Sequence, residues 1–377
     1  MATKVNPVTG ALDYYEQALP PFRNKVINGG MKISQRGTSF SFAHDGTTSG
    51  YTLDRFFFQL VNTDEYDCTV SRYSMSESDL NATGHSRAFK LLTGTAESAI
   101  ANDEMVNIQY KIEGQDVQDL QYGTASAKLM TLSFWVKSSI TGTYAVTGYK
   151  DDSTSRIINR TYTINSANTW EKKTISIVGD TDSTGSIVND NGDGFRIIWG
   201  LASGSTYDGS SSTSWTDYTN AHFLGGHAQD GVITTAGADW YLTGVQLEIG
   251  TSSTPFEHRP IGVETRLCER YCQVKNLFVT NTIHFASGYY GGSANYNYYT
   301  LNTTMRSAPS VTISQPTQVQ IYHNNNSWTN VTITVQKTYT DLIGLYFGDN
   351  GNNYNGLIRL TGNATDTKPT ALCSSEL

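Results

Sequence analysis

The chain has 377 residues, with 26 basic and 34 acidic side chains, so its formal net charge is -8. This acidic balance argues against a nucleic-acid partner, which needs a basic surface to contact phosphates. Charged residues make up 16% of the chain, against about 25% in typical globular domains, and 23 tyrosines with abundant Ser, Thr and Asn take their place. Such a composition favours β-sheets with hydroxyl-bearing outer faces over helices.

The first segment, residues 1–23, predicts an N-terminal arm. It contains Pro7, Pro20 and Pro21 and too little apolar surface to fold alone. We expect it either to attach the chain to another protein or to be a loose terminus. No basic segment is followed by an apolar run, so no signal peptide is expected. No stretch approaches the roughly 18 apolar residues that would span a bilayer, so no membrane insertion is expected either.

Residues 24–257 predict an antiparallel β-sandwich. Apolar residues that we expect to face inward alternate with residues that we expect to face outward. The inward residues are Leu132, Phe134 and Val136, and Val245 and Leu247 near the end of the segment. This period of two is typical of strands with one buried face. Gly244 interrupts the period of the last strand and predicts a β-bulge. Strands separated by Gly, Asn and Ser turns, with little helix between them, indicate a two-sheet sandwich.

Residues 258–275 predict a helical connector. Glu264–Gln273 is rich in helix formers and places Leu267 and Tyr271 on one face. So short a helix needs a partner surface, which makes Leu267 and Tyr271 candidate oligomer contacts. Cys268 and Cys272 also share a helix face. Core packing is favoured for them over metal binding, because further Cys or His ligands at a usable spacing are missing from the sequence.

Residues 276–377 return to the β pattern. Val331, Ile333 and Val335 alternate with polar residues, and the intervening turns are rich in Asn and Gly. The prediction is a second, smaller β-sandwich or barrel that forms a distal domain. The fold class is therefore all-β.

Known catalytic and metal motifs are missing from the sequence. It contains no G-x-S-x-G, H-E-x-x-H, P-loop or G-x-G-x-x-G pattern. The spacing of His222 and His227 is unusual for zinc. Residues 189–194 resemble the start of a calcium loop, but Gly200 stands where the loop requires Glu, so a tight turn is expected instead. We predict no enzyme, no cofactor and no metal site, although a pair of carboxylates for glycoside hydrolysis could meet from any part of a fold.

Aromatic residues in polar segments are the candidate ligand-binding groups. Exposed Tyr and Trp among small polar neighbours suit the recognition of a glycan or a protein. The alternative for Tyr296–Tyr299 is that the alternating tyrosines pack on their own sheet. The candidates are Tyr207, Trp215, Tyr218, Tyr289, Tyr290, Tyr296, Tyr298, Tyr322, His323, Trp328 and Tyr354.

Several sequence blocks occur in a fixed order: INGGMKISQRGTSF with Gln35–Arg36–Gly37, LDRFFF with Asp54–Arg55, NTWEKKTI, WYLTGVQLEIG, TPFEHRP and the terminal Ser374–Leu377. Together they resemble the virion surface and tail-fibre proteins of tailed bacteriophages, whose jelly roll is similar to carbohydrate-binding modules. The resemblance implies a structural protein of the virion head or tail, made in the host cytoplasm. It also implies a homotrimer, other virion proteins as partners of the arm, and adhesion to a host cell-surface glycan.

Two other readings remain open. The chain could be a free, lectin-like carbohydrate-binding module, or a head decoration protein without a specific receptor. The resemblance also places Glu248 where related jelly rolls hold a structural calcium, although a solvated carboxylate on the outer face is favoured. Arg36 is expected either to pair with Asp54 or Glu257, or to be a surface charge.

Overall fold

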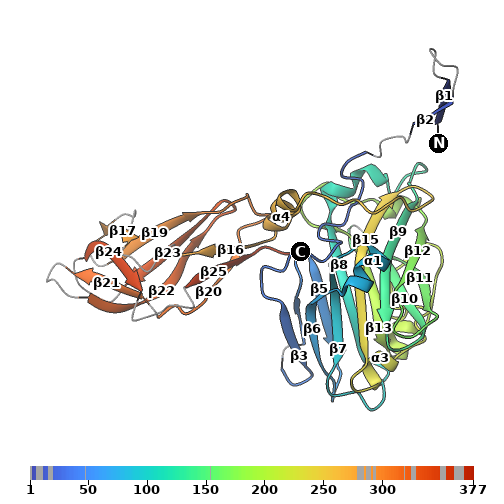
Figure 1. Cartoon of the computed structure of the whole chain (residues 1–377), viewed down its shortest axis with the longest axis horizontal. Coiled ribbons are helices and arrows are strands. Elements are labelled where there is room, and N and C mark those ends of the chain that lie inside the picture. Colours follow the sequence, from blue (N-terminus) through green and yellow to red (C-terminus); the bar gives the residue numbers. More distant parts are fainter. Residues whose placement is uncertain are drawn as a thin grey trace.

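The computed structural model describes residues 2–5, 12–15, 20–46, 48–152, 154–277, 284–285, 290–291, 294–317, 319–323, 328–348, 354–360 and 369–377. Side chains are described for residues 20–46, 48–152, 154–277, 297–317, 320, 330–347 and 369–377. A larger and a smaller β-domain lie on either side of helix α4 (Ile261–Glu269) (Figure 1). The predicted all-β fold, with an antiparallel jelly-roll sandwich, a short helix and a second β-domain, is confirmed.

The larger domain is a sandwich of two antiparallel sheets. The first contains, in spatial order, β14 (Thr216–Asp217), β11 (Arg156–Ile164), β10 (Gly142–Lys150), β13 (Asp193–Ser203), β8 (Met105–Glu113), β5 (Phe56–Val61) and β4 (Ser49–Tyr51). The second contains β12 (Glu171–Ile177), β9 (Met130–Ser138), β15 (Asp239–Ile249), β7 (Arg87–Thr93), β6 (Asp67–Ser74) and β3 (Ser39–Ala43).

One continuous apolar core fills the space between the two sheets. Leu132, Phe134 and Val136 of β9 are all fully buried there, as their alternation predicts. Trp199 of β13 and Trp240 of β15 enter the same core from opposite sheets. Each such side chain contributes about 1.5–3 kcal/mol by leaving water. The core therefore fixes which residues of each strand face outward and can form sites.

The bulge predicted at Gly244 is present. The register of β15 against β9 shifts between Thr243 and Gln246, and Gly244 has a φ of 60°. A Cβ at this position would lie 2.4 Å from Nε2 of His85. Both the left-handed backbone and the close contact with His85 therefore require glycine here.

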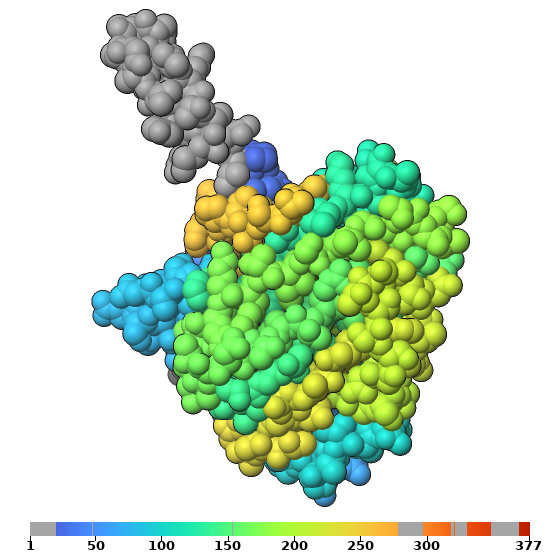
Figure 2. All heavy atoms as spheres, turned by 90° about the vertical axis from the view of Figure 1, so that its right-hand side faces the viewer, coloured from blue at the N-terminus to red at the C-terminus, as the bar shows by residue number. Residues whose placement is uncertain are grey.

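The two ends of the sandwich can be identified by the residues that pair across β8 and β13. At one end lie Glu113 and Asp193, which pair across β8 and β13; we call it the junction end. At the other, the far end, Met105 pairs with Ser203. In Figure 2 the segment leading to α4 covers the upper, junction end, and the chain between β7 and β8 closes the lower, far end.

Short helical segments lie in the loops of the larger domain. Figure 2 shows the segment that carries α1 projecting from one side of the sandwich. None of the helices in the described part of the chain is long and apolar enough to span a bilayer. The segments are α1 (Glu77–Thr83), η1 (Gly114–Leu120), η2 (Ser183–Gly185), α2 (Ser205–Asp208), η3 (Asn220–His222) and α3 (Gly231–Thr234).

The smaller domain also consists of antiparallel sheets. One contains β16 (Cys272–Asn276), β25 (Thr370–Ser374) and β20 (Ser310–Ile313). The other contains β17 (His284–Phe285), β24 (Tyr354–Leu360), β21 (Val319–His323), β22 (Trp328–Thr338), β23 (Leu342–Gly348), β19 (Ala294–Thr300) and β18 (Tyr290–Gly291). In the arm, β1 (Ala2–Val5) pairs with β2 (Leu12–Tyr15).

The connector helix lies earlier in the chain than predicted. It begins after Pro260, which stands at the N-cap, and ends at Glu269. The predicted helix runs to Gln273, but Cys272 already pairs with Ser374 in the sheet of β16 and β25. Cys268 and Cys272 are both buried free thiols, in agreement with the packing prediction.

Candidate functional site

A hollow of about 380 Å³ opens at the edge of the sandwich, at its junction end. It lies where β14 and β11, at the edge of the first sheet, meet the chain that leaves β12, at the edge of the second. Its volume is in the range of small-molecule sites, about 300–1,000 Å³. The lining residues are Arg156, Val178, Gly179, Asp180, Thr181, Asp182, Ser214 and Trp215.

A buried ion pair forms the polar wall of this hollow. Nε of Arg156 donates to Oδ2 of Asp180 at 2.6 Å, and the guanidinium also donates to Asp217 at 2.8 Å. Burial disfavours the charge of Arg156, but the hydrogen bond and the charge of Asp180 outweigh it and raise the pKa of the guanidinium. Arg156 is therefore a permanent cation, held in a fixed orientation by two carboxylates.

Trp215 supplies the aromatic surface of the hollow. Its Nε1 donates to the carbonyl of Val178 at 2.7 Å, which fixes the plane of the indole. The ring packs edge-on against Tyr122 and Phe195, with centroids 5.6 and 6.2 Å away. The side chain is half-buried and remains in contact with the hollow. It thus offers a rigid apolar surface beside charged groups, which is an arrangement suited to a sugar ring.

Asp182 supplies an exposed carboxylate at the same hollow. Hydrogen bonds from the backbone N–H and the hydroxyl of Thr184 lower its pKa. The lining contains the carboxylates of Asp180 and Asp182 against the single cation Arg156. Its charge therefore favours neutral ligands over acidic ones.

Tyr207 and Tyr218 lie apart from this hollow. Both pack against Phe223, with ring centroids 6.4 and 6.2 Å away, in a small apolar cluster. Tyr218 also packs on Tyr149 and donates its hydroxyl to Asn220 at 2.7 Å. Both side chains therefore take part in packing within the sandwich.

The candidates of the smaller domain are described only in part. Tyr298 is 48% exposed on β19. Its neighbour Tyr299 instead packs against the core of that domain, and burial raises its pKa to about 12. Tyr289 lies outside the described residues, and the side chains of Tyr290, Tyr296, Tyr322, His323, Trp328 and Tyr354 lie outside those described.

Sequence reasoning missed an aromatic cluster on the outer face of the second sheet. Lys137 lies 4.6 Å from the ring centroid of Tyr241 and 5.0 Å from that of Trp170, and Lys90 lies 5.7 Å from that of Tyr73. The signal that could have found it is the outward alternation along β9 and β15, where Lys137 pairs with Tyr241. Because ammonium groups cover these rings, they offer a sugar less free aromatic surface than Trp215 does.

Leu267 and Tyr271, the candidate oligomer contacts, have different surroundings. Leu267 is half-buried and lines a hollow of about 200 Å³ with Phe22. Tyr271 is 1% exposed and donates its hydroxyl to Glu113 of the sandwich. The structure thus places Tyr271 in a contact within the chain, because the helix ends before it and the residue turns into the domain boundary.

Two groups of contacts join the sandwich to the smaller domain, and Glu113 is at the centre of the first. Nε and Nη2 of Arg270 each donate to its carboxylate at 2.7 Å. Burial opposes the charge of Glu113, but the hydrogen bonds from Arg270 and Tyr271 outweigh it and hold its pKa below the usual range.

Glu376 is at the centre of the second group of contacts between the domains. It pairs with Arg55, which is 1% exposed, and with Arg36, whose Nη2 lies 3.1 Å from its carboxylate. Arg306 donates to the carbonyls of Ser375 and Glu376 at 2.8 and 2.9 Å. Sequence blocks that are far apart in the chain therefore meet at one junction, between the sandwich and the end of the described chain (Figure 1).

Two expectations about charged residues are wrong. Arg36 pairs with Glu376 rather than with Asp54 or Glu257, because Asp54 accepts two hydrogen bonds from Gln35. Glu248 is not solvated on the outer face. It is 3% exposed, accepts hydrogen bonds from Gln246 and Thr254, and lies 3.7 Å from Arg23.

Comparisons with known proteins find solved structures that resemble this chain only distantly, and they show no family. No family model and no curated protein matches the chain. A family 11 carbohydrate-binding module from Clostridium thermocellum, in complex with a β-1,3-1,4-mixed-linked tetrasaccharide, is 8% identical, covers 58% of this chain and 98% of its own, and has a TM-score of 0.28. A CBM4 structure is 10% identical. The match covers 51% of this chain and 94% of the CBM4 chain, with a TM-score of 0.26. A third structure contains the CBM22-1–GH10 modules of xylanase 10B from Clostridium thermocellum, complexed with xylohexaose. It is 12% identical, and the match covers 60% of this chain and 28% of the xylanase chain, with a TM-score of 0.26.

Proposed function

We propose that the protein is a non-enzymatic sugar-binding protein and that the hollow at Trp215 binds the glycan. The observation that carries the proposal is the half-buried indole of Trp215 beside the Arg156–Asp180 pair and Asp182. The indole can cover the apolar face of a sugar ring, while the carboxylates accept hydrogen bonds from its hydroxyls. The negative balance of the lining favours neutral glycans.

A panel of immobilised neutral and uronic-acid polysaccharides tests this proposal. We expect the chain to bind a neutral polysaccharide without releasing reducing ends, and Trp215→Ala to weaken binding at least about 10-fold, as for an interface residue that dominates affinity. Trp215→Phe keeps an aromatic ring and more of the packing against Tyr122 and Phe195, so it should retain part of the binding. Equal binding by wild type and Trp215→Ala would place the sugar elsewhere. Release of reducing ends would contradict a purely binding role.

We further propose that the chain displays this site on the surface of a tailed-phage particle, as a trimer. The support for the phage setting is the ordered sequence blocks, several of which supply the domain junction: Arg36, Arg55 and Glu376. A rigid junction suits a protein that holds one domain away from the body on which it is mounted. Detection of the chain in purified particles tests the placement, and head and tail fractions distinguish its position.

A further inference from the structure

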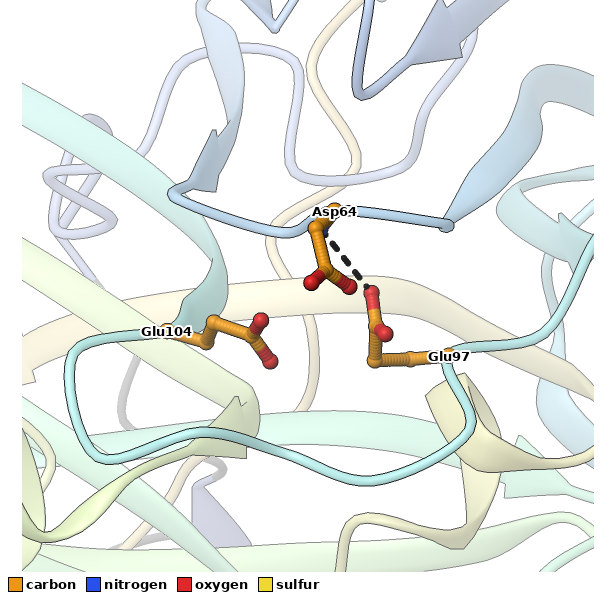
Figure 3. A group of neighbouring side chains, drawn as sticks. All are labelled: Asp64, Glu97 and Glu104. Carbon is orange, nitrogen blue, oxygen red and sulfur yellow. Dashed lines mark hydrogen bonds between the residues drawn. The ribbon is translucent and has the colours of Figure 1, made fainter.

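Three carboxylates meet at the far end of the sandwich, away from the Trp215 hollow. Asp64 lies in the loop between β5 and β6, and Glu97 and Glu104 lie in the loop between β7 and β8. Each residue contributes one carboxylate oxygen, and these three oxygens lie within 4.8 Å of one another. Figure 3 shows the three side chains directed toward the same small space.

The two glutamates of this cluster are buried. Glu97 is 1% exposed and Glu104 is 3% exposed, whereas Asp64 is exposed and leaves a path to solvent. Backbone N–H groups of Asp64 and Glu65 donate to Oε2 of Glu97 at 3.3 and 3.2 Å, and that of Ala101 donates to Oε2 of Glu104 at 2.9 Å. These contacts hold the side chains in place without neutralising them.

A second observation points to a missing partner. Oε1 of Glu97 is buried, and no hydrogen-bond partner for it exists among the residues that the structure describes. The same holds, within the described part of the chain, for the buried hydroxyl of Thr63 directly beside Asp64. Buried polar atoms of this kind are normally satisfied by protein, water or an ion, so each requires an explanation.

The charged neighbours with the largest effect on the two glutamates are all acidic. For Glu104 these neighbours are Glu97, Asp64 and Asp103, and for Glu97 the neighbour is Asp64. Burial, followed in effect by these neighbours, raises the pKa of Glu104, and burial raises that of Glu97. Charges taken out of water are normally paired or coordinate a metal. A cation at the centre of the three carboxylates would remove the repulsion and satisfy the free oxygen of Glu97.

We propose that Asp64, Glu97 and Glu104 bind a calcium ion that ties together the two loops crossing between the sheets. The ligands are all oxygens, which hard divalent cations prefer. Calcium binds oxygen ligands at about 2.3–2.6 Å in a flexible geometry, so three carboxylate oxygens within 4.8 Å of one another are close enough to share one ion. Magnesium requires a near-ideal octahedral geometry and usually keeps several waters, so it is less suited to a site built from several carboxylates of the protein.

The position of the site gives the ion a structural role. The β5–β6 loop leaves the first sheet for the second, and the β7–β8 loop returns from the second to the first. The backbone N–H of Glu97 also donates to the carbonyl of Ile233 in α3 at 3.1 Å. Calcium would therefore fasten the far end of the sandwich, independently of glycan binding at the other end.

The full chain, freed of metal with EDTA and then dialysed, tests the proposal by calorimetric titration and thermal unfolding with CaCl2. We expect one ion per chain and a Tm that rises with CaCl2 concentration by mass action. Removing one ligand charge in Glu97→Gln should weaken calcium binding by at least about 10-fold, since even changes in the surroundings of metal ligands cost about 10–100-fold. The matched control is Glu77→Gln, an exposed acid on α1.

The sign of the stability change distinguishes calcium binding from a merely structural role. Glu97→Gln keeps an acceptor for the two N–H groups but removes a charge. Without calcium it should therefore have a Tm at or above that of wild type, and with calcium a lower one. Asp64→Asn, at the exposed position, should also lose the calcium response and serves if Glu97→Gln does not fold. No binding heat for wild type, or a calcium response of both variants equal to that of Glu77→Gln, would overturn the proposal. An equal response to MgCl2 would overturn the assignment to calcium.

Discussion

The guanidinium carbon of Arg55 lies 3.4 Å from the centre of the Tyr271 ring. Arg55 stands at the start of β5 in the sandwich, and Tyr271 follows α4 at the start of the smaller domain. The same guanidinium pairs with Glu376, 321 residues further along the chain. Arg55 therefore joins the sandwich, the connector and the end of the described chain in one buried contact.

Glu376→Gln should loosen the domain junction. The substitution leaves Arg55 and Arg36 without their counter-charge in a buried setting, and breaking such a pair costs about 3–5 kcal/mol. We expect a lower Tm and faster proteolysis near α4, measured by thermal unfolding and limited proteolysis. Glu77→Gln provides the control for loss of a surface carboxylate. A Tm equal to that of the control would show that the junction does not depend on Glu376.

The junction should also weaken in acid through Glu113. Its pKa is lower in the folded protein than its usual value, so the ionised carboxylate favours folding. This stabilisation is complete above the usual Glu pKa of about 4.3 and is lost as the pH falls through the lower, folded-state pKa. Tm profiles against pH should therefore fall below about pH 4.3 in wild type. The fall should be smaller in Glu113→Gln, and parallel profiles would contradict this account.

Asp182→Asn should reduce glycan affinity without unfolding the protein. Asn can still cap η2, so little stability should be lost. A hydroxyl donates a stronger hydrogen bond to a charged carboxylate than to a neutral amide, so affinity for a neutral glycan should fall, by up to about 10-fold. Affinity for an acidic glycan should rise instead, because a negative charge is removed. Isothermal titration measures both, and Asp45→Asn, another exposed acid, should change neither.

Leu267→Asp should dissociate the proposed trimer. Leu267 lines the hollow beside Phe22, which is 57% exposed, and Ile261 on the same helix is 58% exposed. Light scattering should give three times the 41.4 kDa chain mass for wild type and a single chain mass for the variant. Leu80→Asp, at a 40% exposed leucine on α1, should leave the mass unchanged. A monomeric wild type would remove the basis for the trimer.

Alternation of apolar residues was enough to predict the sandwich. A strand with a period of two has one face that must leave water, and Leu132, Phe134 and Val136 occupy that face. Gly244 likewise revealed its bulge, because a local break in the period has a local cause. Such signals act over neighbouring residues and can be read along the chain.

The sites depend on contacts that have no local signal. Trp215 was predicted as a ligand-binding residue, yet its partners Arg156 and Asp180 come from other strands and loops. Arg36 was expected either to pair with Asp54 or Glu257 or to be a surface charge, whereas it pairs with Glu376, which lies near the other end of the sequence. The pattern of a strand states which side chains face outward, but not which outward side chains meet.

The sequence by itself determined the all-β fold class and the inward faces of strands such as β9, because burial of apolar side chains follows a short period. Only the tertiary structure decided the partners of the charged residues. Asp64, Glu97 and Glu104 come from two loops and converge because both loops cross between the same two sheets. Charge pairing depends on distance in space, and the chain path that sets this distance is fixed by the whole core.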